Sequence, residues 1–390
     1  MKRFYKSAVI FLLLLQSFFS CATFAEEVKP IRIGVSLSLT GKYAEFGQPQ
    51  QMAYRLWEEQ VNQRGGILKR PVKVIIQDDK SDTETAIKIY QHFMDEEKIE
   101  LIFGPYSSTI TAAVAPWVEK RGYPMLAAGA SSDEIWRKGY QYVFGVLTPS
   151  SRHMVGFFGL LSKTAIDRIA VVSIDDPFAN AVAEGAKRWA PEYSLNIVDY
   201  RVLPKKEPDL LSAAQAARDA GAQILIMAGY FEESVAMRKI LKKMGWTPKA
   251  FYASTGPTLQ KYYDNLGVDA QGTFACTNWE SKENLRLPGS ADFLKSFRAR
   301  YHETPSQHHA LAYAAGEILE QAILKIGSVD RVALRQAMAT MDINTIVGRY
   351  AVDRAGLQVK RLPLIIQWQG NKREVVWPEE LRTADVVLNK

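Results

Sequence analysis

Cysteine is scarce in this chain, which has two in 390 residues, Cys21 and Cys276. Because Cys21 lies in a leader segment that we expect to be removed or anchored, Cys276 stands alone in the mature chain. A lone cysteine excludes an intramolecular disulfide even in an oxidising compartment. Cys276 ends the apolar stretch 273–276, so we expect it to be a core residue rather than a reactive thiol.

Long apolar runs are also scarce. After the first two dozen residues, charges, glycine or proline interrupt every apolar run within about eight residues, whereas a membrane-spanning helix needs about 18. The sequence therefore excludes a membrane-spanning helix beyond its start.

The start of the chain is the exception. Three basic residues between positions 2 and 6 precede an apolar run over 8–15, and small residues follow. This order is typical of a secretory signal peptide. We expect cleavage after Ala25 and a periplasmic mature chain. The alternative is lipidation of Cys21, which the bulky Phe18 and Phe19 before it disfavour.

Excess charge of one sign is small in the mature chain. The formal net charge of +7 falls to +4 when the three basic leader residues are removed, and the other basic residues are interspersed with acids. A protein that binds nucleic acid gathers its basic residues in a patch or stripe. The composition therefore excludes nucleic acid as a partner.

Catalytic and metal-binding signatures are missing. Residues 40–42 (TGK) resemble the end of a phosphate-binding loop, but Tyr43 follows the lysine and Ser36 stands where the leading glycine belongs. The chain has no G-x-S-x-G, G-x-G-x-x-G or H-E-x-x-H motif. His308 and His309 are adjacent, so they project to different faces of a helix and do not chelate one ion. We expect no enzymatic activity, no cofactor and no metal site.

What the sequence does have is a regular alternation of β-rich runs and helical patterns. This alternation at this spacing predicts parallel sheets with helices on both faces. A mature chain of about 365 residues exceeds what one core supports, so we expect an α/β protein of two doubly wound parallel-sheet lobes. The first unit has expected strands at 31–39, 72–77, 100–103 and 124–128, and helices at 48–63, 83–97 and 109–120. The second has strands at 168–174, 195–202, 224–228 and 250–253, and helices at 178–189, 209–220 and 232–244.

The last quarter of the chain breaks the alternation. Helices are expected at 290–301, 308–326 and 331–341, followed by two antiparallel strands at 350–352 and 364–369 around a turn at 353–356. The simplest interpretation is that the chain crosses back, adding its helices to the first lobe and its hairpin to the second. We expect a signal peptide at 1–25, an N-terminal lobe of 28–148 plus 279–340, and a C-terminal lobe of 149–278 plus 341–390.

Ligands of open α/β sheets lie beyond the carboxyl ends of the strands, so the loops there are the candidate site. The loop at 38–47 supplies aromatic walls, and those at 104–109 and 128–132 supply hydroxyls and backbone N–H groups. Ser108 or Thr109 opens the helix predicted to reach residue 120, where a carboxylate would meet N-terminal amides and a hydroxyl; plain helix capping is the alternative. Asp78 and Asp79 are expected to cap loops, with cation binding as the alternative.

Short motifs follow one another in a distinctive order along the first unit: 31–34 (IRIG), 39–41 (LTG), 62–67 (NQRGGI), 78–79 (DD), 103–105 (FGP), 107–108 (SS) and 129–131 (GAS). In order, spacing and strand context they resemble the branched-chain amino-acid type of periplasmic solute-binding protein, the leucine-binding-protein-like family. The resemblance spans nearly the whole mature chain. It implies a type I periplasmic binding protein fold with three hinge crossings and delivery of the ligand to the permease of an ABC transporter.

The resemblance also assigns roles to residues. Ser108 matches the serine that bonds the ligand carboxylate, and Gly129 and Ser131 match the backbone and hydroxyl contacts to the same group. Phe46 matches a loop aromatic, and Phe178 and Tyr230 match aromatics of the second lobe. The expected ligand-binding residues are Tyr43, Phe46, Tyr106, Ser107, Ser108, Thr109, Gly129, Ala130, Ser131, Phe178, Tyr230, Thr255 and Glu280.

One departure from the family changes the expected ligand. Amino-acid binders of this group place a carboxylate after the strand that ends near Ala253, where this chain has Thr255. An ammonium in a closed, dry cleft without its counter-charge is costly. We therefore expect an aromatic or other organic acid, or an amide, without that ammonium. An amino acid is the alternative, because Asp176, Glu233 or Glu280 could supply the missing charge. The expected protein is a monomer; the alternatives are a ligand-sensing regulator on the same fold and an α/β enzyme.

Overall fold

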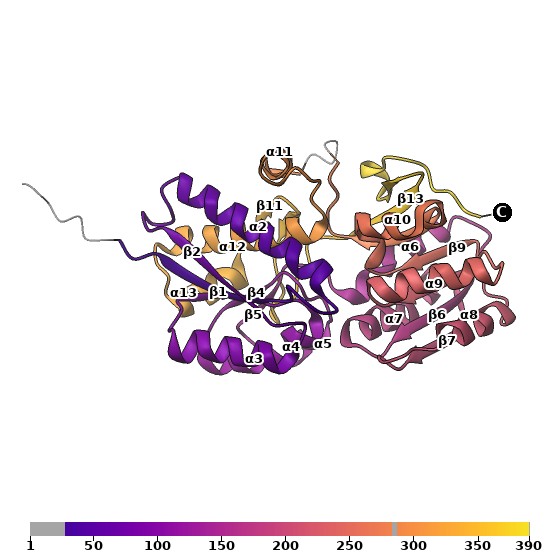
Figure 1. The fold of residues 1–390 in the computed structure, drawn as a ribbon, viewed down its shortest axis with the longest axis horizontal. Coiled ribbons are helices and arrows are strands. Elements are labelled where there is room, and N and C mark those ends of the chain that lie inside the picture. The colour runs from indigo at the N-terminus through magenta and orange to yellow at the C-terminus, as the bar shows by residue number, and fades with distance from the viewer. Residues whose placement is uncertain (1–27, 283–286, 390) are drawn as a thin grey trace, which may run out of the picture. The chain divides into compact units, whose positions relative to one another are not determined.

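The structure is a computed structural model that describes residues 28–282 and 287–389. The predicted leader, with its cleavage and lipidation alternatives, lies outside the described residues. One compact unit of the chain begins at Ile31. Its described residues form two large β-sheets with their helices, labelled in Figure 1, and one small two-stranded sheet.

The first sheet has five parallel strands in the order β2-β1-β3-β4-β5. From β1 the chain continues to β2 on one side, and from β2 it crosses over to β3 on the other side of β1. The topological switch point therefore lies between β1 and β3. The first four strands lie where the sequence predicted them, and β5 is additional. Their bounds are β1 (Ile31–Leu37), β2 (Val72–Asp78), β3 (Leu101–Phe103), β4 (Met125–Ala127) and β5 (Val143–Gly145).

The second sheet has seven strands in the order β14-β13-β10-β9-β8-β6-β7. Strands β6 to β10 are parallel and repeat the topology of the first sheet, with the switch point between β6 and β8. Two antiparallel strands, β13 and β14, extend it beyond β10. The bounds are β6 (Arg168–Ile174), β7 (Asn196–Leu203), β8 (Ile224–Ala228), β9 (Ala250–Ala253), β10 (Thr273–Thr277), β13 (Leu364–Gln369) and β14 (Lys372–Trp377).

Four helices of the described chain begin at a capping aspartate. Asp82, Asp176, Asp209 and Asp330 each accept a backbone N–H of the first turn with their side chains, which satisfies a group that the helix itself cannot. The longer helices are α2 (Ala44–Gln63), α3 (Thr83–Gln91), α4 (Ser108–Arg121), α6 (Met154–Leu161), α7 (Pro177–Trp189), α8 (Leu210–Asp219), α9 (Phe231–Lys243), α10 (Gln260–Leu266), α11 (Ser290–Tyr301), α12 (Gln307–Ile326) and α13 (Arg331–Thr340).

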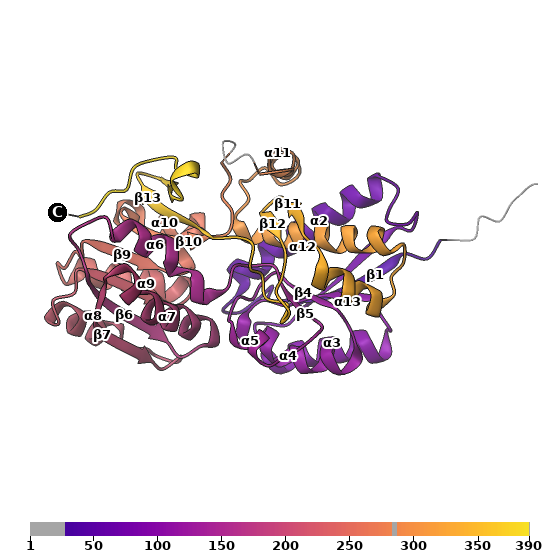
Figure 2. The ribbon, with the colours of Figure 1, turned by 180° about the vertical axis from the view of Figure 1, so that it is seen from behind.

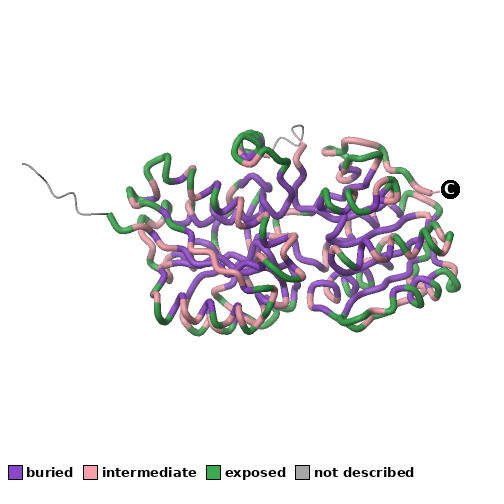
Figure 3. Tube along the Cα trace, viewed as in Figure 1, coloured by how far each residue is buried: buried purple, intermediate pink, exposed green. Residues whose placement is uncertain are grey.

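The tail of the chain adds helices to the first sheet and strands to the second. Helix α12 packs against α2, and α13 packs against α12, so that α2, α12 and α13 cover one face of the first sheet (Figure 2). The inner strands of both sheets are buried, the edge strands β2, β7 and β14 are only partly buried, and the outward sides of the helices are exposed, as Figure 3 shows.

Two expectations for the tail differ from the structure. Residues 364–369 form β13, as expected, but this strand pairs with β14 and β10 rather than with residues 350–352. Around the predicted turn, Val352 instead forms a single bridge to Gln358. Residues 343–350 form a separate small sheet, β11 (Ile343–Thr345) with β12 (Gly348–Tyr350). Ile346 and Tyr350 are buried in the hydrophobic core that strands of the first sheet form with α2 and α12. This part of the chain therefore packs with the first sheet rather than with the second.

Three segments of the chain connect the two large sheets: the first passes through Val146, the second through Asn278 and the third through Arg361. The Arg361 side chain bonds the other two segments. Its guanidinium donates to the carbonyl oxygens of Val146 and Val347 and to Oδ1 of Asn278. Asn278 Oδ1 also accepts from the backbone N–H of Thr148 at 2.9 Å. Burial lowers the pKa of Arg361 to about 10, which leaves it charged at neutral pH. These bonds hold the three connecting segments side by side.

Gly316 lies in α12 where this helix packs against α2, and we expect its replacement with alanine to destabilise the protein. Glycine to alanine inside a helix normally raises the free energy of unfolding by about 0.5–1 kcal/mol. At Gly316, however, a Cβ would lie 2.5 Å from Cδ2 of the buried Trp57. We expect Gly316→Ala to lower the free energy of unfolding by about 1–3 kcal/mol, as overpacking does. Gly159→Ala in α6, whose Cβ would meet Tyr193 at 3.7 Å, is the matched control and should be neutral or stabilising in a denaturant titration.

Candidate functional site

A small cavity lies at the carboxyl ends of the strands, where segments of both sheets meet. Its volume is about 20 Å³, which is room for about one water molecule. The loops after β3, β4, β8, β9 and β10 contribute to it, as the switch-point rule predicts. The lining residues are Tyr106, Ser107, Ser108, Gly129, Ser131, Leu147, His153, Phe178, Tyr230, Ser254, Thr255, Cys276, Asn278, Gln307 and His308.

The N-terminus of α4 forms one wall of this cavity. The helix begins at Ser108, and Ser107 is its N-cap residue but makes no side-chain capping bond. Ser107 Oγ is buried and has no hydrogen-bond partner among the residues described. The first-turn amides of a helix lack partners within it and carry partial positive charge. The Ser107 hydroxyl is therefore available to a ligand rather than used for capping.

Ser108 is held in place by the neighbouring loop. Its Oγ accepts the backbone N–H groups of Ser131 at 3.1 Å and Ser132 at 3.2 Å. With both bonds accepted, the Ser108 hydroxyl keeps its own proton to donate, which suits an anionic oxygen. Gly129 lets the loop approach this closely, because a Cβ there would lie 2.8 Å from the carbonyl oxygen of Pro105. Ser131 shares a hydrogen bond with Ser150, its Oγ 2.8 Å from the Ser150 Oγ.

Five aromatic rings from both sheets pack around the cavity. Phe46 stacks on Tyr106 with ring centroids 4.9 Å apart, and Tyr43 lies 5.0 Å from Tyr230. Phe178 lies 5.3 Å from Tyr230 on the second-sheet side. Tyr106, Phe178 and Tyr230 line the cavity, whereas Tyr43 and Phe46 stand behind Tyr106 and Tyr230. The rings bring the two halves into contact and leave little free space between them.

The cavity lining carries no aspartate, glutamate, lysine or arginine within the described part of the chain. Thr255 lines it and is 7% exposed. The three acids considered as counter-charges are each already paired. Glu233 accepts from Lys42 Nζ at 2.7 Å, and Glu280 accepts from Arg373 Nε at 3.0 Å.

Asp176 is the third acid, and its partners come from both halves. Oδ2 accepts from Thr109 Oγ1 at 2.8 Å and from Lys205 Nζ at 2.8 Å, and Oδ1 accepts from Tyr230 OH at 2.9 Å. Burial alone would raise the pKa of Asp176, but these hydrogen bonds outweigh it and hold the pKa below its usual range. Asp176 is therefore an ionised carboxylate whose charge is satisfied by the protein, and Thr109 joins α4 to the second half through it.

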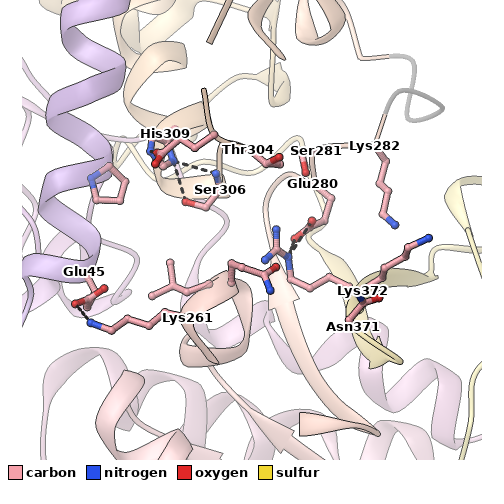
Figure 4. A pocket seen from close by; sticks show the side chains of 15 residues that line it. Glu45, Lys261, Glu280, Ser281, Lys282, Thr304, Ser306, His309, Asn371 and Lys372 are labelled. Carbon is pink, nitrogen blue, oxygen red and sulfur yellow. Dashed lines mark hydrogen bonds and ion pairs between the residues drawn. The ribbon is translucent and has the colours of Figure 1, made fainter. Parts of the chain in front are cut away.

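Glu280 lies at a second and larger cavity of about 620 Å³. Figure 4 shows it beside Ser281 and Lys282, across from the Glu45–Lys261 ion pair. Glu280 is 3% exposed and bound to Arg373, so it does not face the small cavity. Ala130 is buried in the core and is also not among the lining residues.

Five polar lining residues were not among the site residues predicted from the sequence: His153, Ser254, Asn278, Gln307 and His308. His153 and His308 are buried, and neither is part of a motif. Burial lowers the pKa of His153 to about 4 and that of His308 to about 3, so both rings are neutral at physiological pH. Asn278 and Gln307 bond each other where the second connecting segment meets the start of α12.

Other candidates have structural roles. Asp78 accepts backbone N–H groups of Leu39, Thr40 and Lys80, and Asp79 accepts the Ser36 hydroxyl at 2.6 Å, so both acids hold loops as expected. No cluster of three metal-ligating side chains occurs among residues 28–282 and 287–389. Cys276 is a free, buried cysteine, and burial raises the pKa of its thiol, which favours the protonated form.

No helix in the part of the chain that the structure describes is long and apolar enough to span a membrane.

Comparisons with known proteins agree with the geometry. A family model described as periplasmic binding protein matches residues 30–373. The Leu/Ile/Val-binding protein homolog 7 of Brucella suis biovar 1 (strain 1330) is 25% identical over 376 residues, covering 92% of this chain and 94% of that protein.

Solved structures share the fold. A branched-chain amino acid transporter substrate-binding protein from Streptococcus pneumoniae, in complex with isoleucine, has a TM-score of 0.80 at 21% identity, covering 93% of this chain and 100% of that one. A solute-binding protein of an ABC transporter from R. palustris, in complex with benzoate, has a TM-score of 0.78 at 16% identity, covering 92% and 99%. The fold is thus the type I periplasmic binding protein fold predicted from the sequence, with two α/β lobes. This chain belongs to the periplasmic binding protein family.

Proposed function

We propose that this protein is an exported, non-enzymatic solute-binding protein that captures a small organic carboxylate lacking an ammonium group. It holds the ligand between its two lobes and delivers it, as a monomer, to the permease of an ABC transporter. The observation that carries the proposal is the small cavity between the lobes, where hydroxyls and helix N-terminal amides meet and where the described lining has no charged side chain.

The carboxylate subsite is the N-terminus of α4. Ser107 and Ser108 present hydroxyls there, and the first-turn amides of α4 add partial positive charge. Hydrogen bonds to a charged group are worth about 1.5–3 kcal/mol each, so two or three of them supply a large part of the roughly −8 kcal/mol of a micromolar complex. Gly129 and Ser131 complete this subsite.

The pairing of the acidic side chains near the cavity supports a ligand without an ammonium group. Asp176, Glu233 and Glu280 are each neutralised by a basic side chain of the protein, and Thr255 contributes a hydroxyl where an acid would be needed. A buried ammonium without an ionic partner costs several kcal/mol. The two structural relatives differ in this respect: isoleucine carries an ammonium, and benzoate does not. The charges of this cavity fit a ligand of the second kind.

The aromatic rings fit a closing mechanism. A cavity of about 20 Å³ is too small for benzoate, so the lobes must open and the rings must move apart before a ligand enters. On closure, Phe178 and Tyr230 return over the ligand. The Lys42–Glu233 and Thr109–Asp176 contacts re-form between the lobes. We propose lobes of residues 28–148 plus 279–340, and of 149–278 plus the C-terminal strands, as the moving bodies.

A thermal-shift panel tests the proposed function. Aliphatic and aromatic carboxylic acids, carboxamides and the common amino acids are each added at 1 mM, and the melting temperature is measured. A ligand present at 100 times its Kd stabilises the folded state by about 2.7 kcal/mol. We expect carboxylic acids without an α-ammonium to raise the melting temperature. A panel in which amino acids alone do so would contradict the proposal.

A further inference from the structure

The two neutral histidines of the small cavity have ring nitrogens that nothing in the described protein satisfies. His153 Nδ1 and both ring nitrogens of His308 are buried and have no hydrogen-bond partner among the described residues. His153 is 5% exposed and His308 is 2% exposed, and both line the cavity. A buried polar atom without a partner costs about 1–3 kcal/mol, so such atoms at a binding site point to a group on the ligand.

The hydrogen bond of His153 fixes which nitrogen carries its proton. Nε2 lies 3.3 Å from the carbonyl oxygen of Thr148, and a carbonyl oxygen only accepts. Nε2 therefore carries the proton, and Nδ1 presents a lone pair. A lone pair needs a donor and repels a carboxylate. His153 Nδ1 is thus a site for an O–H or N–H group and not for the acid group of the ligand.

His308 completes the polar side of the cavity. Its ring lies 5.0 Å from Phe46 and 5.8 Å from Tyr106, so it packs at the edge of the aromatic cluster. A neutral imidazole with two unsatisfied nitrogens offers one donor and one acceptor. A hydroxyl or a carboxamide also has both functions, so either group satisfies the ring. Asp176, which bonds the lining residue Tyr230, is already neutralised by Lys205. It therefore does not favour a cationic donor over a neutral one.

Resting on the proposed function, we propose that the ligand carries a neutral hydroxyl or carboxamide in addition to its carboxylate, and that His153 and His308 recognise it. The ligand class is a hydroxy acid or a monoamide of a dicarboxylic acid. His153 Nδ1 accepts the donor of that group, and His308 supplies the second bond. A site built to bond a hydroxyl or amide discriminates strongly against an analogue that lacks it, because its polar atoms stay unpaired.

Calorimetric titration of matched acids tests the inference. Benzoate is compared with its three monohydroxy derivatives, and 5-methylhexanoate with 4-carbamoylbutanoate, which has the same number of heavy atoms. We expect at least one donor-bearing acid to bind tenfold or more tightly than its parent. Equal or tighter binding of the parents in every pair would overturn the inference while leaving the proposed function intact. If no acid of either kind binds, the proposed function fails and the inference falls with it.

Variants and spectroscopy separate recognition from a structural role. His153→Phe and His308→Phe should bring the affinity ratio within each pair toward one. His309→Phe is the matched control, because His309 bonds Ser306 at the start of α12 and does not line the small cavity. It should lower stability and leave the ratio unchanged. In the wild-type protein, the ¹⁵N resonance of His153 Nδ1 should move to lower frequency with the donor-bearing acid alone. An unchanged resonance would contradict the assignment even where a variant fails to fold.

Discussion

Replacing Ser108 with alanine is expected to weaken binding of a carboxylate ligand by roughly 30- to 150-fold. In the proposed function this hydroxyl donates to the ligand acid group, and a hydrogen bond to a charged group is worth about 2–3 kcal/mol. The substitution also removes the oxygen that accepts the N–H groups of Ser131 and Ser132, which keep the loop after β4 in place. Calorimetric titration of wild-type and variant protein with the acid that stabilises best gives the ratio directly.

Ser290→Ala is the matched control for this substitution. Ser290 is also buried in the first lobe, where its Oγ accepts from Trp279 Nε1 at 2.8 Å, and it does not line the cavity. Both variants lose a buried hydroxyl, so both should lose about 1–2 kcal/mol of folding free energy. Only the variant at Ser108 should lose affinity. Equal affinity losses in the two variants would show that the effect of Ser108 comes from stability.

Introducing an acid at Thr255 is expected to have the largest effect on specificity. In Thr255→Glu a carboxylate enters a cavity whose described lining has no lysine or arginine and whose two histidines are neutral. Two carboxylates about 5 Å apart repel each other by about 3 kcal/mol at an effective dielectric constant near 20, so we expect affinity for the acid to fall by more than 100-fold. The same change supplies the counter-charge that an α-ammonium needs. Isoleucine or leucine should then bind measurably.

Thr255→Gln separates charge from size in this experiment. Glutamine has the shape of glutamate without its charge, so it should weaken acid binding less than Thr255→Glu and should not create amino-acid binding. Burial raises the pKa of a new carboxyl group, so the difference between the two variants should grow from pH 5 to pH 8 as that group ionises. Titrations at both pH values check the sign. A loss of affinity that is equal in the two variants at pH 8 would refute the electrostatic explanation.

Much of the fold could be predicted because its signals are local. Strands β6, β8 and β9 and helix α11 have the bounds that the pattern predicted, since each is a long or fully apolar run between clear turn residues. Other elements gave no such signal. Strand β5 has three residues, which is too short for a period, and α6 is apolar on nearly all sides. The hairpin of β13 and β14 was missed because strand pairing depends on tertiary contacts.

The candidate site could be predicted where it lies on strand ends and not where it lies at the hinge. Ser107, Ser108, Gly129 and Ser131 follow their strands directly, so the topology brings them together. His153 lies on the segment that follows β5, where its ring bonds the carbonyl oxygen of Thr148 and lines the cavity. His308 comes from a helix more than 150 residues further along the chain. No local pattern marks either histidine.

The partners of the buried acids could also not be predicted from the sequence. Glu280 was a candidate for binding a ligand ammonium, but its partner Arg373 lies 93 positions away on β14. Asp176 caps α7 and bonds Lys205, Thr109 and Tyr230, which come from three separate parts of the chain. The conclusion that these acids are already neutralised needs the three-dimensional structure.

We propose that the small cavity binds a carboxylate and offers no counter-charge to an ammonium. Parallel calorimetric titrations of the wild-type protein with leucine and with 4-methylpentanoate, which is leucine without its amino group, measure this preference. We expect 4-methylpentanoate to bind at least tenfold more tightly than leucine. Tighter binding of leucine than of its deaminated analogue would contradict it.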